Sequence, residues 1–422
     1  MSGPLPIKAP AEIVRERRSP VSTKILNQAA EIVETVRAEG ESALRRYSEG
    51  FGDITERQTI VLGRADLLEA VDGLDGQTRD LLERVANRVR RFATAQLGSM
   101  TSLDVAVEGG RAGHSLHPVG RVGAYAPGGR HPLPSSVLMT VIPARVAGVE
   151  EVWVASPRPT QVTIAAAGIA GADGLLAVGG AQAIAALAFG TVSPACEMVV
   201  GPGNAWVTAA KKHLYGEIGI DGLAGPSEIV LIADHDADPA LVAADLLAQA
   251  EHDPMAQPIL ITTSEALLDE VQLELSMQLE DLPTAAVARS ALSQGFAVSV
   301  DSFEDAVSIS EHLAPEHLAL HVTDPDELSK DLTAYGSLFI GDASAEALAD
   351  YGVGPNHVLP TGGGARFQSG LSVFTFLRTP TWLRIDDAHA TASDAANLAR
   401  LEGLEAHARA ALRRGDRPKT VL

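Results

Sequence analysis

The sequence predicts an α/β protein built from two doubly wound, Rossmann-like units. From residue 119 onward, short apolar runs alternate with segments long enough to form a helix, which is the pattern of successive βαβ units with parallel strands. The candidate strands cover residues 122–126, 152–155, 175–178, 197–200, 228–233, 258–262, 297–300, 317–322 and 337–340. These nine strands are more than one compact sheet usually holds, so we expect two sheets.

The two ends of the chain are expected to be mainly helical. Apolar residues recur at helical spacing over residues 25–36 and 78–95, with a short strand candidate at 58–62 between them. Residues 392–414 are rich in alanine and carry leucines on one stripe, which is typical of a helix packed on a neighbour.

No low-complexity linker or fixed-period repeat separates the units, so we expect their chain segments to be interleaved. The predicted division has residues 1–20 as an N-terminal arm and residues 21–124 with 228–370 as one discontinuous α/β domain. Residues 125–227 form a second α/β domain, and residues 371–422 a C-terminal helical extension.

The composition excludes several classes of protein. The 422 residues include 54 acidic and 33 basic side chains, a formal net charge of −21, without the basic surface that nucleic-acid binding requires. The longest apolar stretch, residues 162–189, is interrupted by glycine-rich turns, so we expect helix, strand and helix rather than a membrane span. Cys196 is the single cysteine, which rules out an intramolecular disulfide, and no secretory signal is visible. We therefore expect a cytoplasmic protein whose partner is a small molecule.

Four glycine-rich segments indicate where such a ligand binds. No G-x-G-x-x-G fingerprint follows a strand. Instead, YAPGG, GGAQ, GPGN and GPSE are each expected to close a strand, at residues 125–129, 179–182, 201–204 and 225–228. Glycine at the carboxyl end of a strand lets a ligand approach the backbone, and open α/β sheets bind ligands at that edge. Each segment alone is compatible with an ordinary turn, but together they predict a ligand crevice.

Two further segments combine side chains that can bind metals. Gln249 and His252 lie three residues apart at the end of a predicted helix over 241–250, so both project from one face. An imidazole and an amide oxygen suit a divalent metal, although surface pairs of this kind are common. Asp350 and His357 lie in a glycine-rich loop that is compatible with metal or substrate binding and equally with a plain turn.

Glu316 and His317 form a candidate acid–base pair at a helix-to-strand junction. The segment from His312 to His317 is one residue too long for the H-x-x-E-H helix of some zinc proteases, and Pro315 would break such a helix. Adjacent Glu and His residues can share a proton path through water, as general acid–base catalysis requires. A solvated loop pair is the alternative.

Glu402 and His407 are expected on the C-terminal helix, about 140° apart around its axis. They do not face one small ligand unless the helix ends or bends between them, which Gly403 allows. Two solvated polar side chains are the alternative.

Together these segments resemble the histidinol dehydrogenase family from about residue 22 to residue 411. The resemblance rests on eight segments in the family's order: GRVGAYAPGG, GGAQAIAALAFGT, VVGPGNAWV, LAGPSEIVLIAD, LLAQAEHD, APEHL, DYGVGPNHVLPTGG and LEGLEAH. One such match can arise by chance, whereas eight in register are specific.

The resemblance implies roles for the residues above. It implies that Glu316 and His317 are the catalytic pair. The implied ligands of one zinc ion per subunit are Gln249, His252, Asp350 and His407, with His407 donated across a homodimer through an exchanged C-terminal segment. The implied substrate contacts are Ser227, Gln249, His252, His317, Asp350, His357, Glu402 and His407. The implied NAD contacts are Tyr125, Gln182 and Asn204, which places NAD on the 125–227 domain.

The resemblance also implies oxidation of L-histidinol to L-histidine, the last step of histidine biosynthesis. Conversion of a primary alcohol to a carboxylate removes four electrons, and hence requires two hydride transfers to NAD through an aldehyde-level intermediate. In this scheme His317 is the general base, Glu316 activates the water that adds to the aldehyde, and zinc positions the substrate. The alternative is a related zinc- and NAD-dependent dehydrogenase of another polar alcohol, such as a sulfonated diol, which is expected to lack Glu402 or His407.

Overall fold

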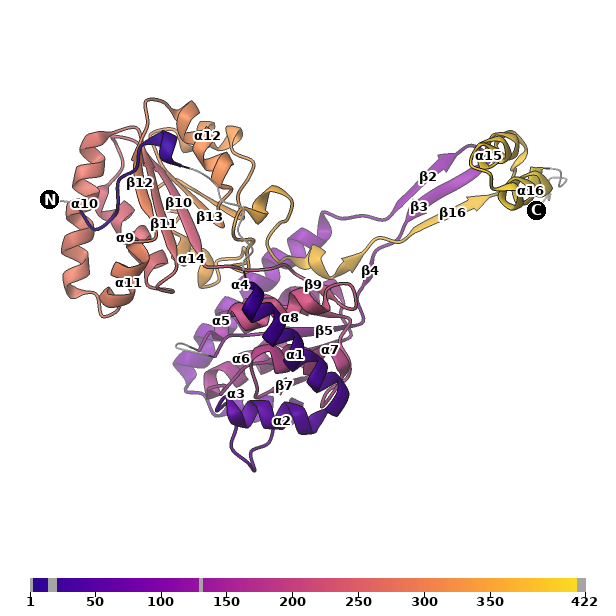
Figure 1. Ribbon diagram of the computed structural model, residues 1–422, viewed down its shortest axis with the longest axis horizontal. Coiled ribbons are helices and arrows are strands. Elements are labelled where there is room, and N and C mark those ends of the chain that lie inside the picture. The colour runs from indigo at the N-terminus through magenta and orange to yellow at the C-terminus, as the bar shows by residue number, and fades with distance from the viewer. Residues whose placement is uncertain (1–2, 14–20, 129–131, 416–422) are drawn as a thin grey trace.

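The computed structural model describes residues 3–13, 21–128 and 132–415, which form two α/β units and a projecting arm (Figure 1). Each unit is built around its own sheet, which confirms the two sheets expected from the number of predicted strands. Gly129 of the first glycine-rich segment and part of the predicted N-terminal arm lie outside the described residues. Within the described ranges, no helix is both long and apolar enough to cross a membrane.

The first unit contains a six-stranded sheet with the order β1-β7-β6-β5-β8-β9, in which only the β1–β7 pair is antiparallel. Its strands are β1 (Val61–Gly63), β5 (Arg121–Tyr125), β6 (Glu151–Ala155), β7 (Gly174–Leu176), β8 (Met198–Val200) and β9 (Gly219–Ile220). Its helices are α1 (Thr23–Glu39), α2 (Glu41–Gly50), α3 (Arg64–Asp72), α4 (Gly76–Gly98), α5 (Pro134–Ala147), α6 (Gln161–Ala170), α7 (Gly180–Phe189) and α8 (Ala205–Leu214).

Both faces of this sheet are buried. Side chains alternate along a strand, so Val152 and Val154 of β6 pack on the face covered by α3, α4, α5 and α6, whereas Ala155 packs on the opposite face. Helices α1, α2, α7 and α8 cover that second face. A strand covered on both sides has no polar face, which explains why these strands are continuous apolar runs in the sequence.

The second unit contains a five-stranded, fully parallel sheet with the order β12-β11-β10-β13-β14. Its strands are β10 (Glu228–Ala233), β11 (Gln257–Thr262), β12 (Phe296–Ser299), β13 (His317–His321) and β14 (Ser337–Ile340). Its helices are α9 (Pro239–Ala250), α10 (Glu265–Asp281), α11 (Ala285–Leu292), α12 (Phe303–Leu313), α13 (Pro325–Leu328) and α14 (Glu346–Asp350). Central strand β10 buries Ile229 and Leu231 towards α9, α10 and α11, and Val230 and Ile232 towards α12.

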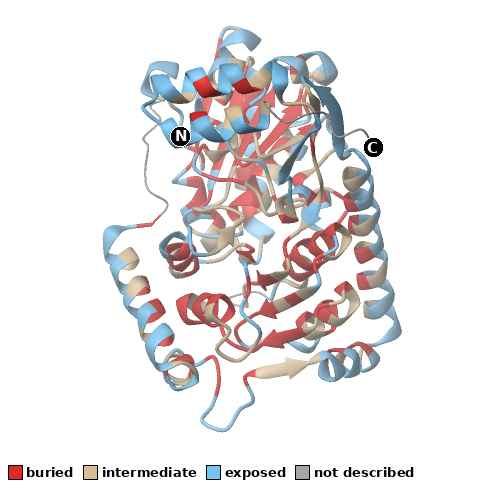
Figure 2. Cartoon of the chain, turned by 90° about the vertical axis from the view of Figure 1, so that its right-hand side faces the viewer, coloured by how far each residue is buried: buried red, intermediate tan, exposed pale blue. Residues whose placement is uncertain are grey.

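The arm is a three-stranded antiparallel ribbon that carries two helices at its tip (Figure 1). The ribbon consists of β2 (Leu103–Val107), β3 (Gly110–His114) and β16 (Thr381–Ile385), and the helices are α15 (His389–Leu401) and α16 (Glu405–Gly415). At its base, β4 (His117–Pro118) pairs with β15 (Leu377–Arg378). Buried residues concentrate in the two sheets, whereas every residue of β2 is exposed (Figure 2).

The predicted division of the chain into domains is wrong in one respect. Residues 21–124 belong with residues 125–227 rather than with residues 228–370, because β1 extends the first sheet at β7 and α1–α4 pack on that sheet. The N-terminal segment belongs to the second unit: Leu5 is buried in its core, and Ile7 forms a parallel bridge with Ala297 of β12.

The expectation of mainly helical chain ends is confirmed for the first hundred residues, which form α1–α4 and the short strand β1, and is corrected for the C-terminal extension. Residues 381–385 form a strand that pairs with β3, and residues 103–114 form β2 and β3, which were not among the predicted strands. In β2, Leu103, Val105 and Val107 alternate as in a strand with one apolar face, although all three are exposed in this chain. The predicted C-terminal helix is interrupted: α15 ends at Leu401, Gly403 adopts a φ of +79°, and α16 begins at Glu405. All nine strands predicted after residue 119 are present.

Candidate active site

A cavity of about 1360 Å³ lies between the two α/β units. The first unit lines it with the turns that follow β5, β7 and β8, at the carboxyl edge of its sheet. The second unit lines it with the turn before β10, the start of β13 and the loop after α14. The predicted ligand crevice is therefore an interdomain cavity.

The cavity meets opposite edges of the two sheets, which corrects one expectation. The segment at 225–228 leads into β10 instead of closing a strand, so the second sheet faces the cavity with the amino ends of its strands. A glycine-rich turn between two apolar runs does not by itself show whether a ligand would bind at the end of the first strand or at the start of the second. The predicted residues that line the cavity are Tyr125, Gln182, Asn204, Ser227, His252, Glu316, His317, Asp350 and His357.

Glu316 and His317 lie where α12 gives way to β13, as predicted. Ala314 ends α12 with a φ of +51°, and the chain then enters β13 at His317. Both side chains are buried. The solvated loop pair considered as an alternative is therefore excluded for these two residues.

The His317 ring is held by the neighbouring strand. Its Nδ1 lies 3.2 Å from the main-chain oxygen of Glu228, the first residue of β10, and the ring stacks on Phe339. Its Nε2 is buried and has no hydrogen-bond partner among the residues that the structure describes. Burial lowers the pKa of His317 to about 3, which keeps the ring neutral and leaves a lone pair on Nε2.

The Glu316 carboxyl lies beside the same ring. Its Oε2 is 3.7 Å from His317 Nδ1 and accepts a hydrogen bond from the backbone N–H of Glu228 at 3.0 Å. Burial raises the pKa of Glu316 well above its usual range, against the effect of that N–H, and Asp350 raises it further. A carboxyl group with a raised pKa suits proton transfer near neutral pH.

Three side chains near this pair could hold a divalent cation. Ligand atoms of His252, Glu346 and Asp350 all lie within 4.8 Å of one another, with His252 Nε2 4.0 Å from Asp350 Oδ2. Burial raises the pKa of Asp350 to about 7, and it raises the pKa of Glu346 well above the usual range. A bound cation would favour the ionised carboxylates, so this nitrogen and oxygen donor set fits a zinc ion.

Gln249 joins this group through Glu346. The Gln249 side chain is fully buried near the end of α9. With its amide nitrogen facing Glu346, it donates to Oε1 at 2.8 Å and to Oε2 at 3.0 Å, whereas the opposite orientation would set its oxygen against two carboxylate oxygens. The structure thus brings together Gln249, His252 and Asp350.

Sequence reasoning missed Glu346. The residue opens the short helix α14 and lies four positions before Asp350, so both occupy one helical face. That spacing was the available signal, but a Glu and an Asp four apart are common on solvated helices.

His357 is fixed beside Asp350. Its Nδ1 lies 3.1 Å from the Asp350 main-chain oxygen and its Nε2 3.1 Å from Ser136 Oγ on α5. Burial lowers the pKa of His357 to about 4, so the ring is neutral. Ser227 lies directly before β10 and also lines the cavity.

The predicted NAD contacts gather on the first unit. The Tyr125 hydroxyl, at the end of β5, accepts from the Gly180 N–H at 3.3 Å, and burial raises the pKa of Tyr125 to about 12. Gln182 donates to Asp53 at 3.3 Å, while Asn204 caps α8 by accepting from the N–H groups of Trp206 and Val207.

A buried ion pair beneath the GPGN turn was also missed. Lys211 of α8 pairs with Asp221 and donates to the Gly201 main-chain oxygen at 3.1 Å. Asp221 in turn accepts from the Gly201 N–H at 2.7 Å. The pair therefore fixes the turn that presents Asn204.

Glu402 and His407 do not approach the cavity of their own chain. They lie at the end of α15 and on α16, at the tip of the arm, and both are exposed (Figure 1). Any role in an active site would therefore require the site of another copy.

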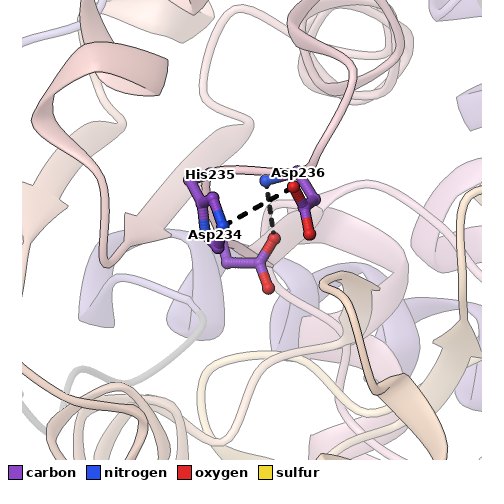
Figure 3. A group of neighbouring side chains, drawn as sticks. All are labelled: Asp234, His235 and Asp236. Atoms are coloured by element: carbon purple, nitrogen blue, oxygen red, sulfur yellow. Dashed lines mark hydrogen bonds and ion pairs between the residues drawn. The ribbon is translucent and has the colours of Figure 1, made fainter.

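A second group with metal-binding side chains lies at the opposite edge of the second sheet. Asp234, His235 and Asp236 follow β10, and their interactions are drawn in Figure 3. Asp234 accepts from the Asp236 N–H at 3.0 Å and from the Thr323 N–H and hydroxyl at 2.8 Å. These hydrogen bonds indicate that the group is a structural polar turn, which links the end of β10 to the segment after β13.

Comparisons with known proteins extend over nearly the whole chain. The family described as histidinol dehydrogenase matches residues 15–415. Curated histidinol dehydrogenases from Thermus thermophilus and Nitrosomonas europaea are 47% and 42% identical, covering 90% and 93% of this chain and 92% and 93% of their own. The crystal structure of histidinol dehydrogenase from Elizabethkingia anophelis superposes with a TM-score of 0.92 at 30% identity and covers 98% of both chains.

Proposed function

The chain belongs to the histidinol dehydrogenase family, and on that premise we propose that it oxidises L-histidinol to L-histidine through Glu316, His317 and one zinc ion per subunit. The family consists of NAD-dependent oxidoreductases of histidine biosynthesis. The observation that carries the proposal is the buried His317 ring in the wall of the interdomain cavity, whose Nε2 has no partner within the described part of the chain and whose pKa burial lowers to about 3. We place the enzyme in the cytoplasm, where this biosynthesis would draw on the cell's NAD.

In the first oxidation His317 would act as the base. Its Nε2 would accept the hydroxyl proton of the substrate while the same carbon gives a hydride to NAD. The hydrogen bond from Nδ1 to the Glu228 carbonyl would stabilise the ring as it gains the proton. The product of this step is the aldehyde.

In the second oxidation Glu316 would activate water. Its carboxylate would take a proton from a water molecule that adds to the aldehyde carbon, while His317 returns the proton it gained in the first step to the aldehyde oxygen, which gives a hydrate and a neutral ring. His317 would then remove a hydroxyl proton from the hydrate as its carbon gives a second hydride to another NAD. The sum is one alcohol, one water and two NAD converted to one carboxylate, two NADH and three protons.

We propose that Gln249, His252 and Asp350 hold the zinc ion together with His407 of the partner subunit. When bound, the zinc would supply a fixed template for the amino and imidazole nitrogens of the substrate. Ser227 and His357 of this chain would complete the substrate contacts, together with Glu402 of the partner subunit. Support comes from the donor atoms of His252 and Asp350, 4.0 Å apart beside the catalytic pair.

NAD would bind on the first unit at the carboxyl edge of its sheet. Tyr125, Gln182 and Asn204 would contact it there, next to turns whose backbone a dinucleotide can approach closely. This arrangement would bring NAD to the catalytic pair from across the cavity.

The arm supports the proposal of a homodimer. Its exposed apolar side chains include Leu383, Leu398, Leu401 and Leu404, with Leu401 86% exposed. A projecting ribbon whose tip exposes leucines is a surface that a second copy would cover. A swapped arm would also carry Glu402 and His407 to the partner's cavity.

The test is an assay of NAD reduction with L-histidinol, with and without a chelator, that counts NADH formed per substrate consumed. We expect two NADH per histidinol and loss of turnover after zinc removal. Turnover of a sulfonated diol but not of histidinol would instead identify the related polar-alcohol dehydrogenase.

A further inference from the structure

Asp53 places a carboxylate in the wall of the interdomain cavity, on the side of the first unit. The residue lies in the loop between α2 and β1, and no step of the proposed mechanism uses it. Its side chain is nearly buried, with the residue 8% exposed. A buried carboxylate that faces a ligand cavity requires an explanation, because an unpaired charge is costly to bury.

One of the two carboxylate oxygens of Asp53 is used within the protein. Oδ2 accepts from the Gly179 N–H at 2.9 Å and from Gln182 Nε2 at 3.3 Å. Oδ1 accepts no hydrogen bond from the residues that the structure describes, so it can accept one from a ligand. Burial raises the pKa of Asp53, against the effects of the Gly179 N–H and of Arg158. A ligand hydroxyl that donates to Oδ1 would further stabilise the ionised form.

The strand order of the first sheet indicates which part of NAD lies near this carboxylate. β5 pairs with β6 on one side and with β8 on the other, and β6 continues to β7, so the order reverses between β5 and β8. A dinucleotide binds across such a point, and an acidic side chain beside the second strand commonly accepts from the ribose 2′-hydroxyl of its adenosine half. In this sheet the corresponding side consists of β6 and β7.

Asp53 lies on that side of the sheet. The Gly179 N–H that it accepts belongs to the turn after β7. A Cβ added to Gly179 would come within 2.7 Å of the Pro157 side chain, so this turn packs against the turn after β6. Residues 156–158, which follow β6, include no acidic side chain. Asp53 therefore provides the carboxylate that β6 itself lacks.

The charge of Asp53 limits the groups that its free oxygen can accept. Asp221, the other acidic side chain that the first unit contributes to the described cavity wall, is already paired with Lys211. The free oxygen of Asp53 can accept from a ribose hydroxyl, whereas it would repel a phosphate. NADP carries a phosphate on the adenosine 2′-oxygen, so this carboxylate would favour NAD.

We propose that Asp53 accepts a hydrogen bond from the adenosine 2′-hydroxyl of NAD and thereby selects NAD over NADP. This inference rests on the proposed NAD site at the carboxyl edge of the first sheet. Arg158, exposed in the turn after β6, interacts electrostatically with Asp53. Once the charge of Asp53 is removed, Arg158 would attract a 2′-phosphate.

The experiment measures the binding of NADH and NADPH by titration of their fluorescence, which requires no turnover. We expect wild type to bind NADH at least about tenfold more tightly than NADPH. We expect D53N to lose at least about tenfold of this preference, because a charged acceptor and a charge that repels phosphate are both removed. Asparagine retains an oxygen for the Gly179 N–H, so the turn keeps its support.

D66N is the matched control. Asp66 of α3 also accepts from a glycine N–H, that of Gly63 at 2.7 Å, but it is exposed and does not line the cavity. We expect D66N to leave both dissociation constants unchanged.

A change in the ligand tests the same contact without a variant, should D53N not fold. Wild type is expected to bind NADH that lacks the adenosine 2′-hydroxyl about tenfold more weakly than NADH. Removal of the 2′-hydroxyl from the nicotinamide ribose should have a smaller effect. The reverse order would place Asp53 at the other ribose and overturn the inference.

The remaining outcomes are distinct. Equal losses of NADH and NADPH affinity in D53N would overturn the inference, because Asp53 would then only hold the turn that carries Gln182. Wild type that bound both cofactors equally well would also overturn it. Wild type that bound neither would instead contradict the NAD site of the proposed function.

Discussion

His317 Nδ1 lies 3.2 Å from the main-chain oxygen of Glu228. A carbonyl oxygen only accepts, so the neutral ring carries its proton on Nδ1 and its lone pair on Nε2. The contact follows from the parallel pairing of β10 with β13, in which Ile229, next to Glu228, is opposite His317. The sheet register thus selects the tautomer of the proposed base.

Replacement of this base is expected to reduce turnover far more than stability. In H317Q the group that accepts the substrate proton is absent, so we expect kcat to fall about 10²–10⁴-fold. The measurement is steady-state NADH formation, with urea unfolding in parallel. H312Q, at the end of α12 and outside the cavity lining, serves as control. A kcat for H317Q within tenfold of wild type would contradict the role as base.

The E316Q variant is expected to separate the two oxidations. Glutamine cannot take a proton from water, so the aldehyde should form while its hydration slows. In a single turnover with enzyme in excess, we expect one NADH in a fast phase and the second in a phase slowed about 10²-fold or more. Equal slowing of both phases would show that Glu316 acts in the first oxidation as well.

The sequence predicted the elements of the two sheets better than their grouping. Strands such as β10 are buried on both faces and stand out as apolar runs, but the assignment of residues 21–124 depends on the three-residue antiparallel pairing of β1 with β7. The strand β2 alternates the apolar residues Leu103, Val105 and Val107, but a run of five residues is a weak signal, and the strand is exposed along its whole length.

The residues of the candidate site were likewise predicted only in part. Glu316, His317 and Asp350 stood in recognisable segments, whereas Glu346 became visible only when the fold placed it against Gln249. A glutamate in a short helix has no local signature of that contact.

Breaking the buried pair of Lys211 and Asp221 is expected to destabilise the first unit. K211M leaves a carboxylate unpaired whose side chain is 5% exposed, so we expect the free energy of unfolding to fall by about 3–5 kcal/mol. K211M/D221N removes both charges and should recover part of this loss. We also expect a raised KM for NAD in K211M, because the turn at Gly201 loses its support. If the single and double variants were equally stable in urea unfolding, the loss in K211M could not be caused by the unpaired, buried carboxylate of Asp221.

His321 is expected to make stability depend on pH. Burial alone favours the neutral ring, but hydrogen bonds to Asp245 at 3.1 Å and to Asp342 at 3.0 Å outweigh it and raise the pKa of His321 above 6.5. A raised pKa in the folded state contributes stability that is complete below the unfolded value and is lost as the pH rises through the folded value. The gap in unfolding free energy between wild type and H321N should therefore be widest near about pH 6 and shrink towards about pH 9. H235N, at an exposed histidine, should show no such trend; a constant gap for H321N would contradict the assignment.

The exchange of His407 between subunits can be tested by complementation. A chain carrying H407N keeps its own Glu316 but offers its partner no imidazole, and a chain carrying E316Q has the reverse defect. If His407 serves the partner's cavity, a mixed dimer has one site with both residues intact, although each pure dimer has none. We therefore expect unfolded and co-refolded mixtures of the two inactive variants to regain up to about a quarter of wild-type activity, because half of the dimers are mixed and each has one working site. If His407 instead served its own chain, neither site of the mixed dimer would be intact and the mixture would stay inactive. The position of His407 at the tip of the arm, outside the cavity lining of its own chain, favours the first outcome.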